Sequence, residues 1–224
     1  MPDAGCRMPD AGCRMPDKNI NWGDGSDLVI HLPRASSVRL QTISADIDIT
    51  DITGEIVIRT VSGDVWGQQI GAATWIKTAS GNITLADGSG SVRAVTVSGD
   101  VSLELEANEV AVDTMSGEVN LELGDFDSLV ARSVNGELVI EGTLNPKGRI
   151  DAATVNGEIE QRLNDPVNAN IEAHAGPGVI ENALTDDEPI RGSSKRIQLK
   201  AVVGDGSAVI RLVTVNGEIH LDGS

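Results

Sequence analysis

The chain has 224 residues, of which 34 are acidic and 17 basic, for a formal net charge of −17. Only 2% of the residues are aromatic and there is no tyrosine, so a core must be built from Val, Ile, Leu, Ala and Thr. The acidic balance argues against nucleic acid and against adsorption to anionic lipid, because both partners require a basic surface. The apolar runs are far shorter than the roughly 20 residues that cross a bilayer, so we expect no direct membrane insertion.

The first 17 residues are a duplication. Met-Pro-Asp-Ala-Gly-Cys-Arg occurs twice and is followed by Met-Pro-Asp. This seven-residue period is unrelated to the rest of the chain, so we interpret residues 1–17 as a leader that is an artefact outside the fold. Both cysteines, Cys6 and Cys13, lie in it and say little about the redox compartment.

Residues 18–41 come next and contain an apolar stretch, 27–32, that ends at Pro33. We predict that they form an incomplete first turn, a cap strand that covers the starting edge of the fold.

Residues 42–224 repeat a four-residue motif, Thr-x-Ser-Gly or a close variant. Its first residues are Thr42, Thr60, Thr78, Thr96, Thr114, Ser133, Thr154 and Thr214. The motif thus recurs at an 18-residue step, then after 19 and 21 residues, and finally after 60, which we interpret as three turns of 20. A fixed period near 20, rich in β-branched residues and punctuated by glycine, is typical of a β-solenoid.

Two columns of residues define the predicted turn. An aliphatic residue stands five positions after each motif start: Ile47, Val65, Ile83, Val101, Val119, Leu138, Ile159 and Ile219. A polar residue precedes each of them: Asp46, Asp64, Asn82, Asp100, Glu118, Glu137, Glu158 and Glu218. We expect the aliphatic column to face inward and the polar column to follow a tight corner at the glycine. Val110, Val112 and Thr114 share a parity, which places the threonine at or inside the corner.

The predicted fold is therefore all-β: a single-stranded parallel β-helix with about 18 to 20 residues per turn and about nine or ten turns along residues 27–222. The His174–Gly178 segment keeps the phase, with Val179 in the inward column, and residues 183–196 replace the following turn with an irregular loop. The last strand, residues 218–222, would be an exposed edge, protected by that loop or by a second molecule.

The repeated Thr-Val-Ser-Gly-Asp-Val motifs, the Leu32-Pro33 pair and the closing Thr214–Glu218 motif resemble a family of bacterial β-strand-repeat domains of unknown function that are described as adhesins. The resemblance covers residues 27–222. It implies a right-handed coil that is usually exported, and it transfers no catalytic residue.

Signals for catalysis or cofactors are absent from the sequence. The histidines are far apart, no Cys-x-x-Cys or Gly-x-Ser-x-Gly occurs, and a motif repeated every turn is structural rather than a unique nucleophile. Hexapeptide acyltransferases share an 18-residue coil, but their six-residue subperiod is not kept here. We expect no enzyme activity, no cofactor and no dedicated metal site.

Two sets of residues are candidates for binding. Asp64, Asp100 and Glu118 belong to a like-charge ladder that divalent cations could relieve, although solvated corner residues would have the same pattern. Trp66 and Trp75 alternate with inward residues and could stack on sugars, or pack against a neighbouring loop.

The sequence thus favours a non-enzymatic envelope or surface protein, an adhesin or scaffold whose rigid coil binds a protein or glycan. It would be extracytoplasmic, in the periplasm or at the cell surface, with a cytoplasmic scaffold as the alternative. The alternative hypotheses are a scaffold polymer that self-associates through its C-terminal edge and a carbohydrate-binding module.

Overall fold

The computed structural model describes residues 28–164, 166–192 and 196–223. The chain divides into two compact units, Met1–His31 and Leu32–Ser224. The duplicated leader, residues 1–17, lies outside the described residues. The described residues form no helix, so none of them makes a helix that could span a membrane.

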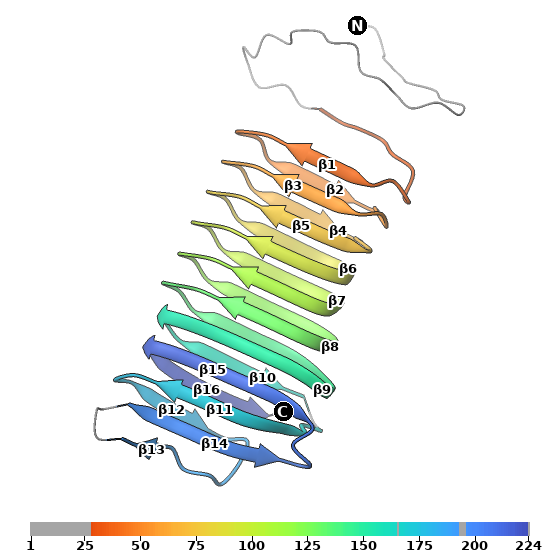
Figure 1. Cartoon of the computed structure of the whole chain (residues 1–224). Helices are drawn as coiled ribbons and strands as arrows, with labels where there is room; N and C mark the ends of the chain where they lie inside the picture. Colours follow the sequence, from red (N-terminus) through yellow and green to blue (C-terminus); the bar gives the residue numbers. More distant parts are fainter. Residues whose placement is uncertain (1–27, 165, 193–195, 224) are drawn as a thin grey trace, which may run out of the picture. The chain divides into compact units, whose positions relative to one another are not determined.

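The second unit is a coil with two strand-bearing faces, which we call sheet A and sheet B (Figure 1). Sheet A begins with β1 (Val38–Gln41), β3 (Ile56–Arg59) and β5 (Ala73–Lys77), and sheet B begins with β2 (Ile47–Thr50) and β4 (Val65–Gln68). Four longer strands then pass through both faces: β6 (Ile83–Val95), β7 (Val101–Asp113), β8 (Val119–Arg132) and β9 (Leu138–Asn156). β10 (Ile159–Leu163) completes this series on sheet B.

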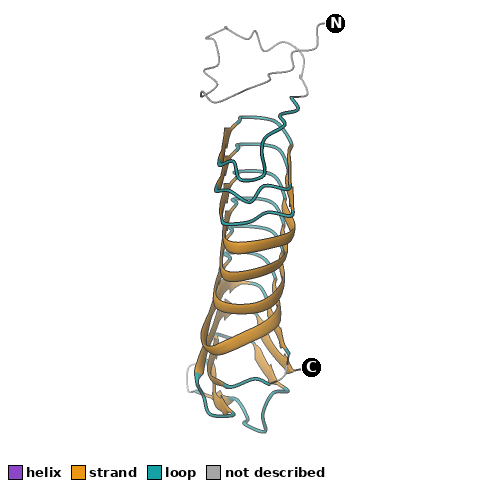
Figure 2. Ribbon diagram, turned by 90° about the vertical axis from the view of Figure 1, so that its right-hand side faces the viewer, coloured by secondary structure: helices purple, strands orange, loops and turns teal. Residues whose placement is uncertain are grey.

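Successive turns pair in parallel and in register, as in Ile83 with Val101 and Val101 with Val119. In Figure 1 the strands of sheet A lie toward the viewer and run to the left, and the chain returns behind them as it descends, so the coil is right-handed. Figure 2 shows the same turns edge-on. The predicted β-solenoid is confirmed, with about 19 residues per turn.

The repeated corner explains the motif. The glycine adopts a positive φ, +126° at Gly63 and +145° at Gly99, and a Cβ there would overlap a carbonyl oxygen of the preceding turn. Only glycine therefore lets two turns stack at this corner. The threonine that opens the motif points inward and is buried, as predicted, and at Thr60 its hydroxyl donates to the Ser62 carbonyl at 3.1 Å.

The aliphatic column is the core of the coil, as predicted. Its members are buried: the most exposed of them, Ile47, has 9% of its surface exposed, and Val101 has 1%. The strand formed by Val101–Leu105 alternates strictly between buried and exposed side chains. Each turn contributes a single layer of small apolar side chains to this stack, so a turn acquires a core only from its neighbours.

The last turn of the chain does not lie at the end of the coil. β15 (Ala208–Asn216) pairs on one side with β9 and on the other with β11 (Ala169–Ala175). β16 (Glu218–Gly223) likewise lies between β10 and β12 (Val179–Asn182). The C-terminal turn is thus inserted between two turns that precede it in the sequence.

This insertion corrects three sequence predictions. Thr214 pairs directly with Thr154, so the 60-residue interval corresponds to one turn in space and not to three. The inward residue after His174–Gly178 is Ile180, which pairs with Ile219, whereas Val179 is only half-buried. The last strand is not an exposed edge, because β16 has a parallel partner on both sides.

The far end of sheet A is closed by two antiparallel strands. β14 (Ile197–Val203) runs antiparallel to β11, and the two-residue β13 (Ile190–Arg191), within the predicted 183–196 loop, pairs with β14. A reversed strand interrupts the parallel series and closes the sheet. At the other end, the described residues 28–33 include no strand, and β1, which lies within the predicted cap of residues 18–41, opens sheet A.

Val101→Asp should unfold the protein or strongly lower its melting temperature, because the carboxylate would enter a single-layer apolar stack without a partner, at a cost of several kcal/mol. Asp100→Asn is the matched control next to it, on an exposed side chain. Circular dichroism melts should separate the two variants clearly, and equal melting temperatures would contradict the inward assignment of the aliphatic column.

A chain that ends at Gly206 should lose far more stability than loss of a terminal turn would cause, since removing β15 and β16 exposes two interfaces at once. Adding a synthetic peptide of residues 207–224 should restore the melting temperature, because the vacated pairing edges match it. A truncated protein that melts like the full chain would show that the inserted turn contributes little.

Candidate functional site

The polar column after each corner acts as a series of backbone caps. Asp46 accepts a hydrogen bond from the Asp64 amide, and the same contact runs from Asp64 to the next turn at Asn82, each bridging 18 residues. Asn82 and Asp100 continue it, with Asp100 accepting from the Glu118 amide at 2.9 Å. Asn82 serves as well as aspartate, so the column needs an acceptor oxygen rather than a charge.

The structure assigns the cation candidates to this capping role. Asp64 and Asp100 each bind the next turn, and Glu118 donates its amide to Asp100. Among the described residues, no group of three or more His, Cys, Asp or Glu side chains is placed to hold a metal ion. A ladder of single carboxylates on successive turns does not converge on one point, as calcium would require.

The second half of the column consists of longer glutamates. The pKa of Glu137 is raised above the ordinary value of 4.5, first by partial burial and then by repulsion from Glu158, Glu118 and Glu160. Burial and the stacked carboxylates therefore both oppose the ionisation of Glu137.

His220 links the inserted turn to both of its neighbours. Its Nε2 lies 3.0 Å from a Glu158 oxygen and 3.5 Å from one of Glu218, and its Nδ1 lies 3.1 Å from one of Glu181. Glu158 precedes β10 and Glu181 lies in β12, so one imidazole bridges the strands on either side of β16. Each ring nitrogen faces a different carboxylate, an arrangement that favours hydrogen bonding over shared metal coordination.

The two tryptophans lie on opposite faces and do not form one site. Trp66 is on sheet B with 40% of its surface exposed, whereas Trp75 is on sheet A and half-buried. The Arg59 guanidinium lies over the Trp75 ring, 4.5 Å from its centroid. This cation–π contact leaves Trp66 as the freer ring of the two predicted stacking residues.

Sheet A bears a cluster of exposed cations that the sequence analysis missed. We call it the cationic patch: Arg39, Arg59, Lys77 and Arg93, around Trp75. No described carboxylate forms an ion pair with the first three, and Arg93 alone contacts one, Asp113, at 3.3 Å. The patch spans the first four turns, and its signal in the sequence was the outward parity of these residues on one face.

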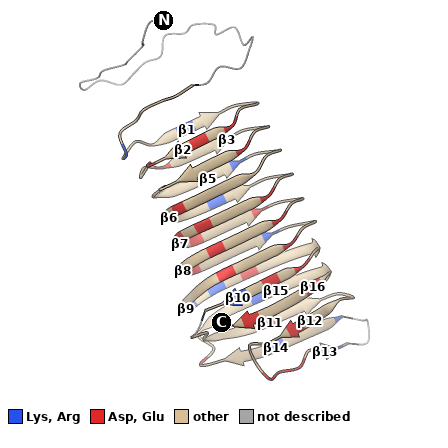
Figure 3. Cartoon of the chain, turned by 180° about the vertical axis from the view of Figure 1, so that it is seen from behind, with Lys and Arg blue, Asp and Glu red and all other residues tan. Residues whose placement is uncertain are grey.

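Sheet B carries the opposite charge. Glu104, Glu122 and Glu141 stack on one another on successive strands, and Arg162 follows them and pairs with Glu141 and Glu160. In Figure 3, which views the molecule from behind, acidic residues recur from strand to strand. These acidic residues of sheet B lie on the opposite face from the cationic patch, and the net charge of −17 conceals that basic region.

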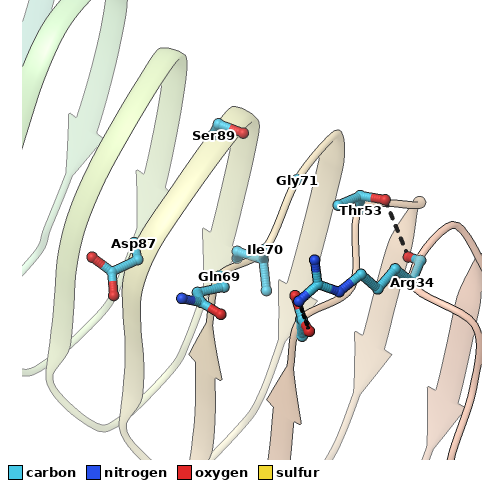
Figure 4. Close-up of a pocket in the computed structure, with 8 residues that line it drawn as sticks. Arg34, Thr53, Gln69, Ile70, Gly71, Asp87 and Ser89 are labelled. Atoms are coloured by element: carbon cyan, nitrogen blue, oxygen red, sulfur yellow. Dashed lines mark hydrogen bonds and ion pairs between the residues drawn. The ribbon is translucent and has the colours of Figure 1, made fainter.

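A shallow hollow of about 310 Å³ lies along the edge opposite the motif corners (Figure 4). Its lining residues are Arg34, Asp51, Thr53, Gln69, Ile70, Gly71, Asp87 and Ser89. Arg34 and Asp51 form an ion pair at one end of it. Asp51, Gln69 and Asp87, one on each successive turn, have φ of 63°, 54° and 53°, so this edge is built from strained corners. The lining includes no histidine, cysteine or lysine.

Comparison with known families gives one match. A family model described as Toastrack DUF4097 matches residues 16–106 and again residues 77–222. Neither the curated proteins nor the solved structures include a significant match to the chain.

Glu137→Gln should stabilise the protein at neutral pH. A carboxyl whose folded-state pKa exceeds its unfolded value binds protons more tightly when folded, so its presence costs stability as the pH rises from about 4.5 through the folded pKa. The glutamine variant should therefore gain in melting temperature above that range and match the wild type below it.

Glu109→Gln, which removes an exposed carboxylate outside the column, is the control for net charge. Equal gains from both changes would attribute the effect to the overall charge rather than to the glutamate column.

Proposed function

Because the chain belongs to the Toastrack DUF4097 family of repeat domains, we propose that it is a non-enzymatic scaffold that binds an anionic partner on sheet A. The cationic patch carries this proposal. The protein has twice as many acidic as basic residues, yet Arg39, Arg59 and Lys77 form no ion pair with a described carboxylate, so an external anion would neutralise them and relieve their mutual repulsion.

The partner that fits best is an acidic glycan or an acidic protein at the cell surface. Arg59 and Lys77 are stacked on adjacent strands about 4.8 Å apart, and Arg39 and Arg93 lie on the strands to either side, offset by two residues, so the patch follows the coil and suits an extended polyanion. The flat, in-register sheet is rigid, so little conformational entropy is lost when such a polymer binds. This is the adhesin or envelope-scaffold role that the sequence favoured.

We place the protein outside the cytoplasm, in the periplasm or at the cell surface. The resemblance to exported domains supports this location, as does an acidic, hydroxyl-rich surface. A cytoplasmic scaffold is the alternative, and it would use the same patch.

Two other functions have narrower support. A carbohydrate-binding module would use Trp66, the more exposed ring on sheet B. A polymer joined through the C-terminal edge loses its original basis, because β16 is paired on both sides and the antiparallel β14 closes sheet A.

Binding to an array of acidic and neutral glycans, with an acidic protein as a further probe, tests the proposal. Arg59→Ser combined with Lys77→Ser should weaken binding at least tenfold, because two unpaired cations are lost, and binding should weaken with added salt. Arg211→Ser, which removes one positive charge from sheet A outside the patch, should bind nearly as the wild type does.

Wild-type binding that survives the double change would refute the assignment of the patch. Binding to neutral sugars that disappears in Trp66→Ala would favour the carbohydrate-binding module instead.

A further inference from the structure

The second residue of every repeated motif forms an exposed apolar line along the coil. We call it the corner ridge: Ile43, Val61, Ala79, Val97, Met115, Val134, Val155 and Val215. Seven of these are large side chains with 36% to 77% of their surface exposed. The serine or asparagine after each one forms a bridge to the next turn, which keeps the ridge in register.

The ridge has a common chemistry that local structure does not require. Valine and isoleucine suit an extended corner, but Ala79 and Met115 are not β-branched, so backbone preference does not explain the series. What the eight residues share is apolarity at a position open to solvent. Eight levels at about 4.8 Å make a line about 34 Å long. Continuous apolar surface of this extent is characteristic of an interaction site.

We propose that the corner ridge is the contact between two copies of this chain, packed side by side with their coils parallel. If the seven large side chains lose on average about 75 Å² of exposed surface, the two copies together bury about 1,000 Å², the lower range for a specific interface. The ridge is the same on both copies, as a two-fold interface requires.

The charges on either side of the ridge select the parallel arrangement. The sheet B side carries the polar column, acidic at seven of eight levels. The sheet A side carries Arg59, Lys77 and Arg132, with Asp113 between them already held by Arg93 at 3.3 Å and Arg132 at 3.9 Å.

A two-fold axis along the coil would place the sheet A side of one copy opposite the sheet B side of the other. Arg59 would then face Asp64, and Arg132 would face Glu137, at the same level of the two coils. An antiparallel pair would instead oppose the two acidic columns along their whole length. Like charges in direct opposition disfavour that arrangement.

Sedimentation equilibrium tests the contact. The wild type should dimerise reversibly, and Val97→Lys with Val134→Lys should weaken dimerisation at least tenfold, because both lysines would meet their own copies across the axis. Ser102→Lys with Asn120→Lys, the same charge change on sheet B, should dimerise as the wild type does. Circular dichroism should give similar melting temperatures for both pairs, since all four positions lie on the outer surface of the coil.

Cysteine cross-linking tests the orientation in a background where Cys6 and Cys13 are serine. In a parallel pair, Val61→Cys and Val155→Cys should each form disulfide-linked dimers on their own. An antiparallel pair would cross-link only a mixture of these two variants and would overturn the proposed geometry.

A wild type that stays monomeric at its highest soluble concentration would overturn the proposal, as would a dimer that survives the ridge lysines. Flotation of the wild type with phosphatidylcholine vesicles that is lost in the ridge variant would assign the ridge to lipid and would equally overturn it.

Discussion

The in-register stacking of turns is the constraint on which the whole structure depends. Parallel backbone hydrogen bonds fix each residue directly above its counterpart 18 to 21 residues earlier, from Ser44 and Ser62 to Asn135 and Asn156. Because one turn encloses only a single layer of side chains, it has no core without its neighbours. The glycine at each corner follows from this contact, since the turn above comes too close for a Cβ.

Insertion of the C-terminal turn extends the same constraint to chain order. A stacked coil needs each level to match the next in shape, and it does not need consecutive levels to be consecutive in sequence. Ile219 lies between Ile159 and Ile180 with the same inward geometry as any other level. The connection from β10 to β11 must therefore leave room for a turn that is synthesised later, so this end of the coil becomes complete only when β15 and β16 are in place.

The sequence predicted what repetition controls and missed what depends on spatial order. The aliphatic column, the buried threonines and the corner glycines all follow from a local period, and the structure confirms them. The interval of 60 residues before Thr214 gave no sign that the chain returns to pair with Thr154, because a regular period measures distance along the chain and not the order of levels. The same limitation made residues 218–222 look like an edge.

The surface chemistry was partly readable in the same way. Parity could have placed Arg39, Arg59 and Lys77 outward, but the sequence analysis missed them because a net charge sums over both faces. The ladder at Asp64 and Asp100 was visible, yet its role as a series of backbone caps required the coordinates, since the acceptor oxygen and the donor amide are 18 residues apart.

Because the turns stack, the residues at each repeated surface position form a continuous column. A property that is weak in one residue therefore becomes strong along the coil. An exposed valine is unremarkable by itself, whereas the same position repeated from Ile43 to Val215 forms a long apolar line. A single aspartate at a corner is well solvated, but partial burial and the carboxylates aligned with it raise the pKa of Glu137. Polar capping offsets this repulsion in the first turns, where Asp and Asn reach the next amide. The longer glutamates of the later turns make no such described contact, and there the inserted β16 brings His220 between Glu158 and Glu181, placing an imidazole where two acidic levels would otherwise face each other.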